Sequence, residues 1–134
     1  MVSHGQIARL GMWGTILLAT ACGVSPSVSS GPGAPPPPPV TVVLEESAFD
    51  PPNATTVDGK PTLTIPIGTT VTWTNLDLIE HTATEYLNGF AKPDARFDLT
   101  LEPEASASYT FDEVGTYEVG CVPHPAMQML VIVE

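Results

Sequence analysis

Short runs of β-branched and aromatic residues, each closed by proline or glycine, limit how this chain can fold. In the run 69–74, Val71 and Trp73 alternate with threonines, which is the period-two pattern of a half-buried strand. Further strands are expected at 40–44, 62–65, 81–85, 97–101, 105–111, 116–119 and 130–133, and a loop over 86–95. Because no stretch of this region has a convincing helical period, the pattern predicts an all-β fold, an antiparallel β-sandwich.

The first 39 residues have the composition of a leader and a linker. Residues 1–21 carry Arg9 ahead of an apolar segment that ends in small residues, the anatomy of a secretory signal peptide. The ending Leu17–Cys22 resembles a bacterial lipoprotein processing site, which would leave Cys22 as a lipid-bearing N-terminus. The alternative is ordinary secretion with cleavage near Ala21. Residues 22–39 are rich in proline, serine and glycine, so they are expected to be an extended linker ahead of a domain at 40–134.

The charge of the chain excludes one class of partner. It has 15 acidic and 4 basic side chains, and one of the basic residues, Arg9, lies in the leader. Nucleic acid is therefore not an expected partner, since phosphate binding needs lysine and arginine. Such an acidic surface favours association with basic proteins.

A thiol, an imidazole and two thioethers lie close together near the end of the chain, at Cys121, His124, Met127 and Met129. These are ligands that copper prefers, and a site of two histidines, one cysteine and a weak methionine is typical of electron-transfer copper proteins. His81 is the only other histidine after residue 40, so it is the candidate for the second imidazole. A lone cysteine is usually a small buried hydrophobe. A closed zinc site needs four good ligands, usually several thiolates, so one mononuclear copper ion is predicted instead.

Three stretches resemble the cupredoxin family, which includes plastocyanin, pseudoazurin and amicyanin. They are 71–75 followed by His81-Thr82, then 115–117 ahead of Cys121, and the loop 121–127. The resemblance covers essentially all of residues 40–134 and implies a Greek-key β-sandwich with one type 1 copper ion. It implies that His81, Cys121 and His124 are the equatorial ligands.

The resemblance also gives roles to neighbours of the expected ligands. Asn75 and Thr82 are expected to tie the His81 loop to the cysteine loop by hydrogen bonds. The chain departs from the family pattern at Glu80, a carboxylate expected to lower the copper potential. It departs again at Gly120, where a bulkier residue is usual.

Two methionines are candidates for the axial ligand. Plastocyanin and pseudoazurin have four residues between the second histidine and the ligand methionine, which would select Met129 here. Amicyanin has two, which would select Met127. Starting from Met127 leaves room for a last strand of about five or six residues. Met127 is therefore the predicted ligand, with Met129 as the first core residue of that strand.

These features together predict a function. The chain is expected to be a monomeric one-electron carrier and not an enzyme. It is expected to be exported and lipid-anchored through Cys22, facing the periplasm or the cell exterior. Apolar residues beside His81 and His124 are expected to form a contact site for redox proteins with a basic docking face. The rival functions are a copper chaperone or storage protein of the cell envelope, and a metal-free interaction sandwich.

Overall fold

Every regular element in the described part of the chain is a β-strand, which confirms the all-β prediction. A computed structural model describes residues 34–134. The strands are β1 (Val40–Glu45), β2 (Ala48–Asp50), β3 (Thr55–Val57), β4 (Lys60–Ile65), β5 (Thr69–Asn75), β6 (His81–Leu87), β7 (Phe90–Ala91), β8 (Asp98–Leu101), β9 (Ser106–Phe111), β10 (Gly115–Gly120) and β11 (Gln128–Val133). Within residues 34–134, no helix is long and apolar enough to cross a lipid bilayer. Cys22 and the predicted leader lie outside the described residues.

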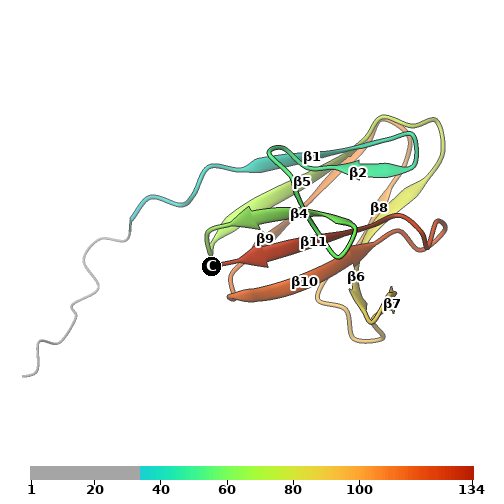
Figure 1. The fold of residues 1–134 in the computed structure, drawn as a ribbon. Helices are drawn as coiled ribbons and strands as arrows, with labels where there is room; N and C mark the ends of the chain where they lie inside the picture. The colour runs from blue at the N-terminus through green and yellow to red at the C-terminus, as the bar shows by residue number, and fades with distance from the viewer. Residues whose placement is uncertain (1–33) are drawn as a thin grey trace, which may run out of the picture. The chain divides into compact units, whose positions relative to one another are not determined.

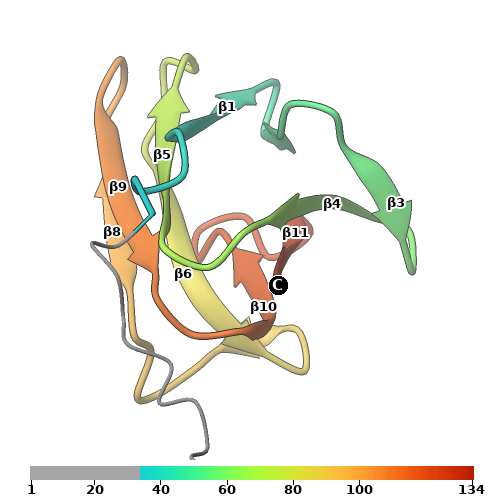
Figure 2. The same cartoon turned by 90° about the vertical axis from the view of Figure 1, so that its left-hand side faces the viewer.

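The strands form two sheets that enclose the core between them (Figure 1). The smaller sheet has the order β2-β1-β5-β9, and the larger has the order β3-β4-β11-β10-β6-β7 with β8 also paired to β6. Figure 2 shows the two sheets curving around the interior. The result is the expected β-sandwich.

The sheets are mixed, whereas the sequence pattern predicted antiparallel pairing throughout. β1 pairs with β5 in parallel, and β4 pairs with β11 in parallel. In both cases strands of the other sheet lie between the two partners in the sequence. The connection therefore crosses from one sheet to the other and back, and the later strand runs in the same direction as the earlier one. The period-two pattern reports which side chains are buried and carries no information on strand direction, so it could not reveal these pairs.

The segment 86–95 was expected to be a loop and instead contains part of a hairpin. β6 continues to Leu87, the chain turns at Asn88-Gly89, and β7 pairs back onto β6. Asn88 and Gly89 have φ angles of 54° and 81°, as a two-residue hairpin turn of the I′ type requires. The short edge strands β2 and β3 were also not predicted, because each has only three residues and little apolar pattern.

The core is built from the inward faces of both sheets and contains a cluster of aromatic rings. Trp73 stacks on Phe97 with ring centroids 5.8 Å apart, and Phe111 meets Tyr117 edge-on at 4.9 Å. The hydroxyl of Tyr117 donates to the carbonyl of Glu113 at 2.8 Å. Packed aromatic pairs of this kind add stability beyond their burial, about 1 kcal/mol each. They give the rigid base on which the loops at either end are mounted.

The strand register brings four distant segments to one end of the sandwich, which we call the metal end. β5 finishes there at Asn75 and β6 begins at His81, while Gly120 at the end of β10 pairs with both Thr84 of β6 and Gln128 of β11. At the other end, Gly68 donates to the carbonyl of Phe111 at 2.7 Å. The segment before β1 reaches this second end.

Candidate metal centre

The loop between β10 and β11 is a tight, hydrogen-bonded turn that starts with the cysteine. The amide of His124 donates to the carbonyl of Cys121 at 3.1 Å, and the amide of Met127 donates to the carbonyl of His124 at 2.8 Å. The amide of Cys121 donates to the carbonyl of Met127 at 3.1 Å, which closes the loop. Pro123 and Pro125 restrict the backbone on either side of His124. The loop therefore fixes where the thiol and the imidazole lie relative to each other.

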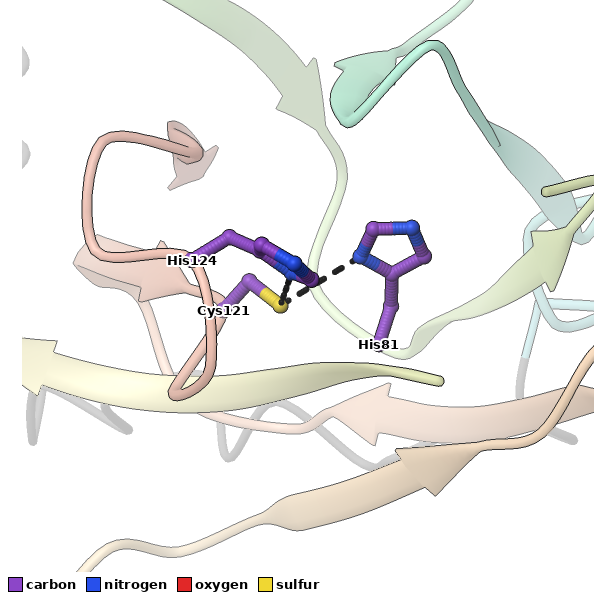
Figure 3. A group of neighbouring side chains, drawn as sticks. All are labelled: His81, Cys121 and His124. Atoms are coloured by element: carbon purple, nitrogen blue, oxygen red, sulfur yellow. Dashed lines mark hydrogen bonds between the residues drawn. The ribbon is translucent and has the colours of Figure 1, made fainter. Parts of the chain in front are cut away.

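The structure brings the three predicted ligands together. Sγ of Cys121 lies 3.5 Å from Nδ1 of His81 and 3.5 Å from Nδ1 of His124 (Figure 3). One donor atom from each residue lies within 4.8 Å of the other two. His81 and Cys121 are fully buried, and His124 is half-buried. His124 thus closes a site that is otherwise inside the protein.

The spacing of these donors fits a single metal ion. An ion with bonds of about 2.0 Å to nitrogen and about 2.3 Å to sulfur, in a trigonal arrangement, separates the two donors by about 3.7 Å. The measured 3.5 Å separations between Cys121 and each imidazole are close to this value. A thiolate with two imidazoles is the donor set that suits copper.

Asp77 is a functional residue that the sequence analysis missed. Its Oδ2 lies 2.8 Å from Nε2 of His81, the ring nitrogen that faces away from the thiol. A carboxylate only accepts, so the proton of the neutral ring belongs on Nε2 and the lone pair of Nδ1 is left free for a metal. The carboxylate expected beside His81 was Glu80, but the one that contacts the ring is Asp77. Its spacing of four residues before His81 was the available signal.

Asp77 is held in its charged form by the turn between β1 and β2. The backbone amides of Ser47 and Glu46 both donate to its carboxylate at 2.9 Å. The amide of Ser47 is the main cause that lowers the pKa of Asp77; partial burial opposes it, and His81 and Glu46 lower it further. Asp77 therefore links three segments: the β1–β2 turn, its own loop and the His81 ring.

Thr82 contacts the cysteine loop as expected. Its backbone amide donates to Sγ of Cys121 at 3.3 Å, and its hydroxyl oxygen accepts from the amide of Val122 at 2.9 Å. The two bonds join the start of β6 to the residues on either side of the Cys121–Val122 peptide. They connect the two segments that carry His81 and Cys121.

Asn75 braces the His81 loop from a different side than expected. Its Nδ2 lies 2.8 Å from the carbonyl of Ile79 and 2.9 Å from that of Leu101, and its Oδ1 accepts from the amide of Asp77 at 2.9 Å. These partners belong to the β5–β6 loop and the end of β8. The predicted tie to the cysteine loop is therefore not among the hydrogen bonds of Asn75. A buried amide takes whichever carbonyls the fold brings near, which a sequence does not reveal.

The two candidate axial methionines occupy successive positions on the inner face of the same ladder. Met129 lies within β11, opposite Val119 of β10. The same register, continued past the end of the strands, sets Met127 opposite Cys121, and the bond from the Cys121 amide to the Met127 carbonyl supports it. Directly opposite residues have Cβ atoms about 5 Å apart, whereas the next pair lies about 7 Å farther along the strand. Both methionines are buried, and the register sets Met127, not Met129, opposite Cys121.

Residues 53–134 match the model of copper binding proteins of the plastocyanin/azurin family. The chain belongs to this family. The cofactor of the family is copper, in agreement with the cluster of His81, Cys121 and His124.

Curated relatives and solved structures point to the same group. Amicyanin from Paracoccus denitrificans is 36% identical over 74 residues, which is 55% of this chain and 56% of that protein. Amicyanin from Paracoccus versutus is 35% identical over 74 residues, 55% of each. The chain thus spans about half the length of the curated relatives it matches. A structure of the reduced state of an amicyanin mutant superposes with a TM-score of 0.55 at 28% identity, covering 71% of this chain and 81% of that one. A Cu(I) structure of a methionine variant of amicyanin gives a TM-score of 0.56 at 28% identity, with the same coverage.

Proposed function

We propose that this chain is a type 1 copper protein that carries single electrons between redox partners. The observation that carries the proposal is the buried cluster of one thiol and two Nδ1 atoms, 3.5 Å from Cys121 to each imidazole. His81, Cys121 and His124 would hold the ion, and Met127 would be the weak axial ligand. When bound, copper supplies a one-electron couple.

The residues around the cluster suit electron transfer because they keep the ligands in place. Asp77 orients His81, and Thr82 clamps the cysteine loop, so little rearrangement accompanies a change of charge at the site. A one-electron carrier needs neither a substrate position nor an acid-base pair, so the chain is expected not to be an enzyme. Stoichiometric copper binding with a reversible one-electron wave in voltammetry would support the carrier, and the absence of a reversible wave would count against it.

The second candidate function, a copper chaperone or store, is disfavoured by burial. Such proteins must exchange their metal, which needs accessible ligands, whereas Cys121 and His81 are fully buried. The two functions differ in a measurable rate. Transfer of copper to a chelator within seconds would favour the chaperone, and retention for hours would favour the carrier.

The proposed docking site for redox partners is the apolar surface of the metal end. Leu76, Leu78, Ile79 and Val122 are between 48% and 89% exposed and lie on the two loops that carry the ligands. Exposed apolar patches of this kind usually mark contact sites. A small apolar patch on the loops that carry the ligands, near the half-buried His124, would allow a short-lived complex with a short electron path from the copper ion to the partner.

The proposed partner has a basic docking face. Lys60, Lys92 and Arg96 are the basic residues after position 40, and each forms an ion pair with a carboxylate. Acidic residues therefore dominate the accessible charge of residues 34–134, which steers cationic proteins toward this one. A fall in the rate of electron transfer to a basic partner with rising salt would support this proposal. A rate independent of salt would contradict it.

The proposed anchor is a lipid on Cys22, followed by the proline-rich linker, in an exported monomer. Pro37 packs beside Gly68 at the end of the sandwich away from the metal end. The described end of the linker, residues 34–39, therefore approaches the domain at that end. Mass spectrometry of the protein from its native membrane tests the anchor: the proposal expects an N-terminal cysteine carrying lipid. An unmodified N-terminus at or after Cys22 in the soluble fraction would contradict it.

A further inference from the structure

The side chain of Gln128 holds the outer part of the loop that carries His124. Its Nε2 donates to the carbonyl of Pro125 at 2.8 Å. The backbone hydrogen bonds of the loop use the carbonyls of Cys121, His124 and Met127, and none of them uses that of Pro125. Among the hydrogen bonds of residues 34–134, this is the only one that a side chain donates to a backbone carbonyl of the segment 122–127.

Gln128 is itself held against the tip of the β6–β7 hairpin. Its Nε2 also lies 3.5 Å from the carbonyl oxygen of Gly89, and a Cβ atom built on Gly89 would lie 3.8 Å from the same nitrogen. The amide of Gly89 donates to Oε2 of Glu118 at 2.9 Å, which fixes the hairpin tip to β10. Gln128 therefore connects the loop with His124 to a hairpin that is bonded to the larger sheet.

The chemistry of the amide group determines which way the end of the Gln128 side chain points. Both of its neighbours are carbonyl oxygens, which only accept, and only the nitrogen of the amide donates. Nε2 carries two protons, so it can serve the carbonyls of Pro125 and Gly89 together. With the amide reversed, Oε1 would face two carbonyl oxygens. The side chain thus has one favourable orientation, and it joins the two backbone segments.

The part of the loop that Gln128 holds is also the most accessible side of the metal site. His81 and Cys121 are fully buried and Met127 is 4% exposed, whereas His124 is half-buried and Pro125 is exposed. Water or a metal ion therefore reaches the donor atoms most directly past His124. A displacement of this part of the loop would open the site and leave the strands in place.

We propose that Gln128 is a positioning residue that keeps His124 closed over the metal site and slows the loss of the bound ion. The other end of the loop is held separately, because the amide of Val122 donates to Thr82. Loss of the Gln128 bond is therefore expected to loosen the segment around His124 and to leave the segment around Val122 unchanged. The role in copper retention rests on the proposed function, whereas the hold on the loop is a property of the chain alone.

The first test measures the hold on the loop in the metal-free protein, by amide hydrogen exchange. The amide of Met127 donates to the carbonyl of His124, so its exchange rate reports opening of this segment. Gln128→Met removes the donor and keeps a side chain of similar length. It is expected to speed exchange of the Met127 amide about fivefold, the ratio that corresponds to the net contribution of one hydrogen bond. The Val122 amide is the internal reference and is expected to keep its parent rate.

Gln128→Glu and two control variants separate the loss of the donor from general effects. Gln128→Glu has the same shape but a carboxylate that only accepts, so exchange of the Met127 amide is expected to rise at least as much as in Gln128→Met. Asn88→Asp adds the same charge to the exposed hairpin turn, where the φ of 54° is one that aspartate tolerates. Thr64→Val removes an exposed hydroxyl from β4 of the same sheet. Both controls are expected to keep the parent rate.

The second test measures how fast the copper-loaded protein loses its ion to a chelator in excess. Gln128→Met is expected to lose copper about fivefold faster than the parent protein and Thr64→Val, because the same opening uncovers the site. Equal copper loss in Gln128→Met and Thr64→Val would overturn the role in retention.

The exchange measurement decides the hold on the loop. A Met127 rate in Gln128→Met that matches the controls overturns the proposal, and so does an equal acceleration at Met127 and Val122, which would report general destabilisation. If the parent protein binds no copper, the proposed function fails, and the exchange rates still decide whether Gln128 holds the loop.

Discussion

Gly120 offers a sharp test of how the sheet is packed beside the metal centre. It lies at the end of β10, next to Cys121, and pairs with Thr84 of β6. A Cβ atom at this position would lie 2.6 Å from Cδ2 of Tyr86 and closer still to Cε2 and Cζ. The ring of Tyr86 therefore occupies the space that a side chain at Gly120 would need. Tyr86 is itself 6% exposed, so its ring has little room to move away.

Gly120→Ala is therefore expected to destabilise the protein. In an ordinary strand this change would stabilise by roughly 0.4–1 kcal/mol, because it restricts the unfolded chain. Here the added methyl group overlaps a buried ring, and overpacking of this kind costs about 1–3 kcal/mol. The expected net loss is about 2 kcal/mol in the free energy of unfolding. For a domain of this size that corresponds to a Tm lower by roughly 10 °C.

The assay is denaturant unfolding of four metal-free proteins: the parent, Gly120→Ala, Tyr86→Leu and the double variant. Tyr86→Leu keeps an apolar cover but removes the ring atoms that the new methyl group would meet. The double variant is expected to lose about 2 kcal/mol less than the sum of the single losses, since the overlap no longer exists. Gly120→Ala with unchanged or raised stability, or strictly additive losses, would refute this account of the packing.

Two further predictions concern the axial ligand and acid stability. Met127→Leu is expected to raise the reduction potential and keep the blue colour, because a weak axial bond tunes the potential more than it holds the metal. Met129→Leu is expected to leave the potential unchanged. Voltammetry decides, and a strong shift from Met129→Leu alone would transfer the axial role to that residue. Burial raises the pKa of Glu85, but the hydrogen bonds and charge of Arg96 outweigh it and hold this pKa below its usual 4.5. The stability from this pair is thus present above pH 4.5 and is lost as the pH falls through the lowered folded-state pKa. In denaturant titrations, the free energy of unfolding of Glu85→Gln should therefore fall less on acidification than that of the parent protein. Parallel pH profiles of the two proteins would contradict the pairing.

The sequence predicted most of the strands because burial on one face leaves a direct trace in the residue pattern. Val71 and Trp73 are buried while the threonines that alternate with them, at 70, 72 and 74, are half-buried, as the alternation of β5 indicated. The turn at Asn88-Gly89 was a hairpin signal of the same kind, but the strand after it has only two residues. Strand direction leaves no such trace, so the parallel pairs β1–β5 and β4–β11 could not be foreseen.

The candidate ligands were predictable because their chemistry is rare in this chain, whereas their supporting groups are ordinary residues. After residue 40 there is one cysteine and there are two histidines, and all three meet at one point. Asp77 is one of fifteen acidic residues, and its spacing of four residues before His81 is the one local signal that marks it out. The carboxylate is fixed beside His81 by the backbone amides of Glu46 and Ser47, which are distant in the sequence and which the sequence does not reveal.

The central claim is that His81, Cys121 and His124 hold one copper ion through a cysteine thiolate. The most direct test is the visible absorption and paramagnetic resonance spectrum of the copper-loaded protein beside its Cys121→Ser variant. The account predicts an intense blue thiolate-to-copper band and one type 1 signal per chain in the parent protein, and the loss of both in the variant with the fold intact. A colourless oxidised parent protein, or a Cys121→Ser variant that stays intensely blue, would contradict the claim.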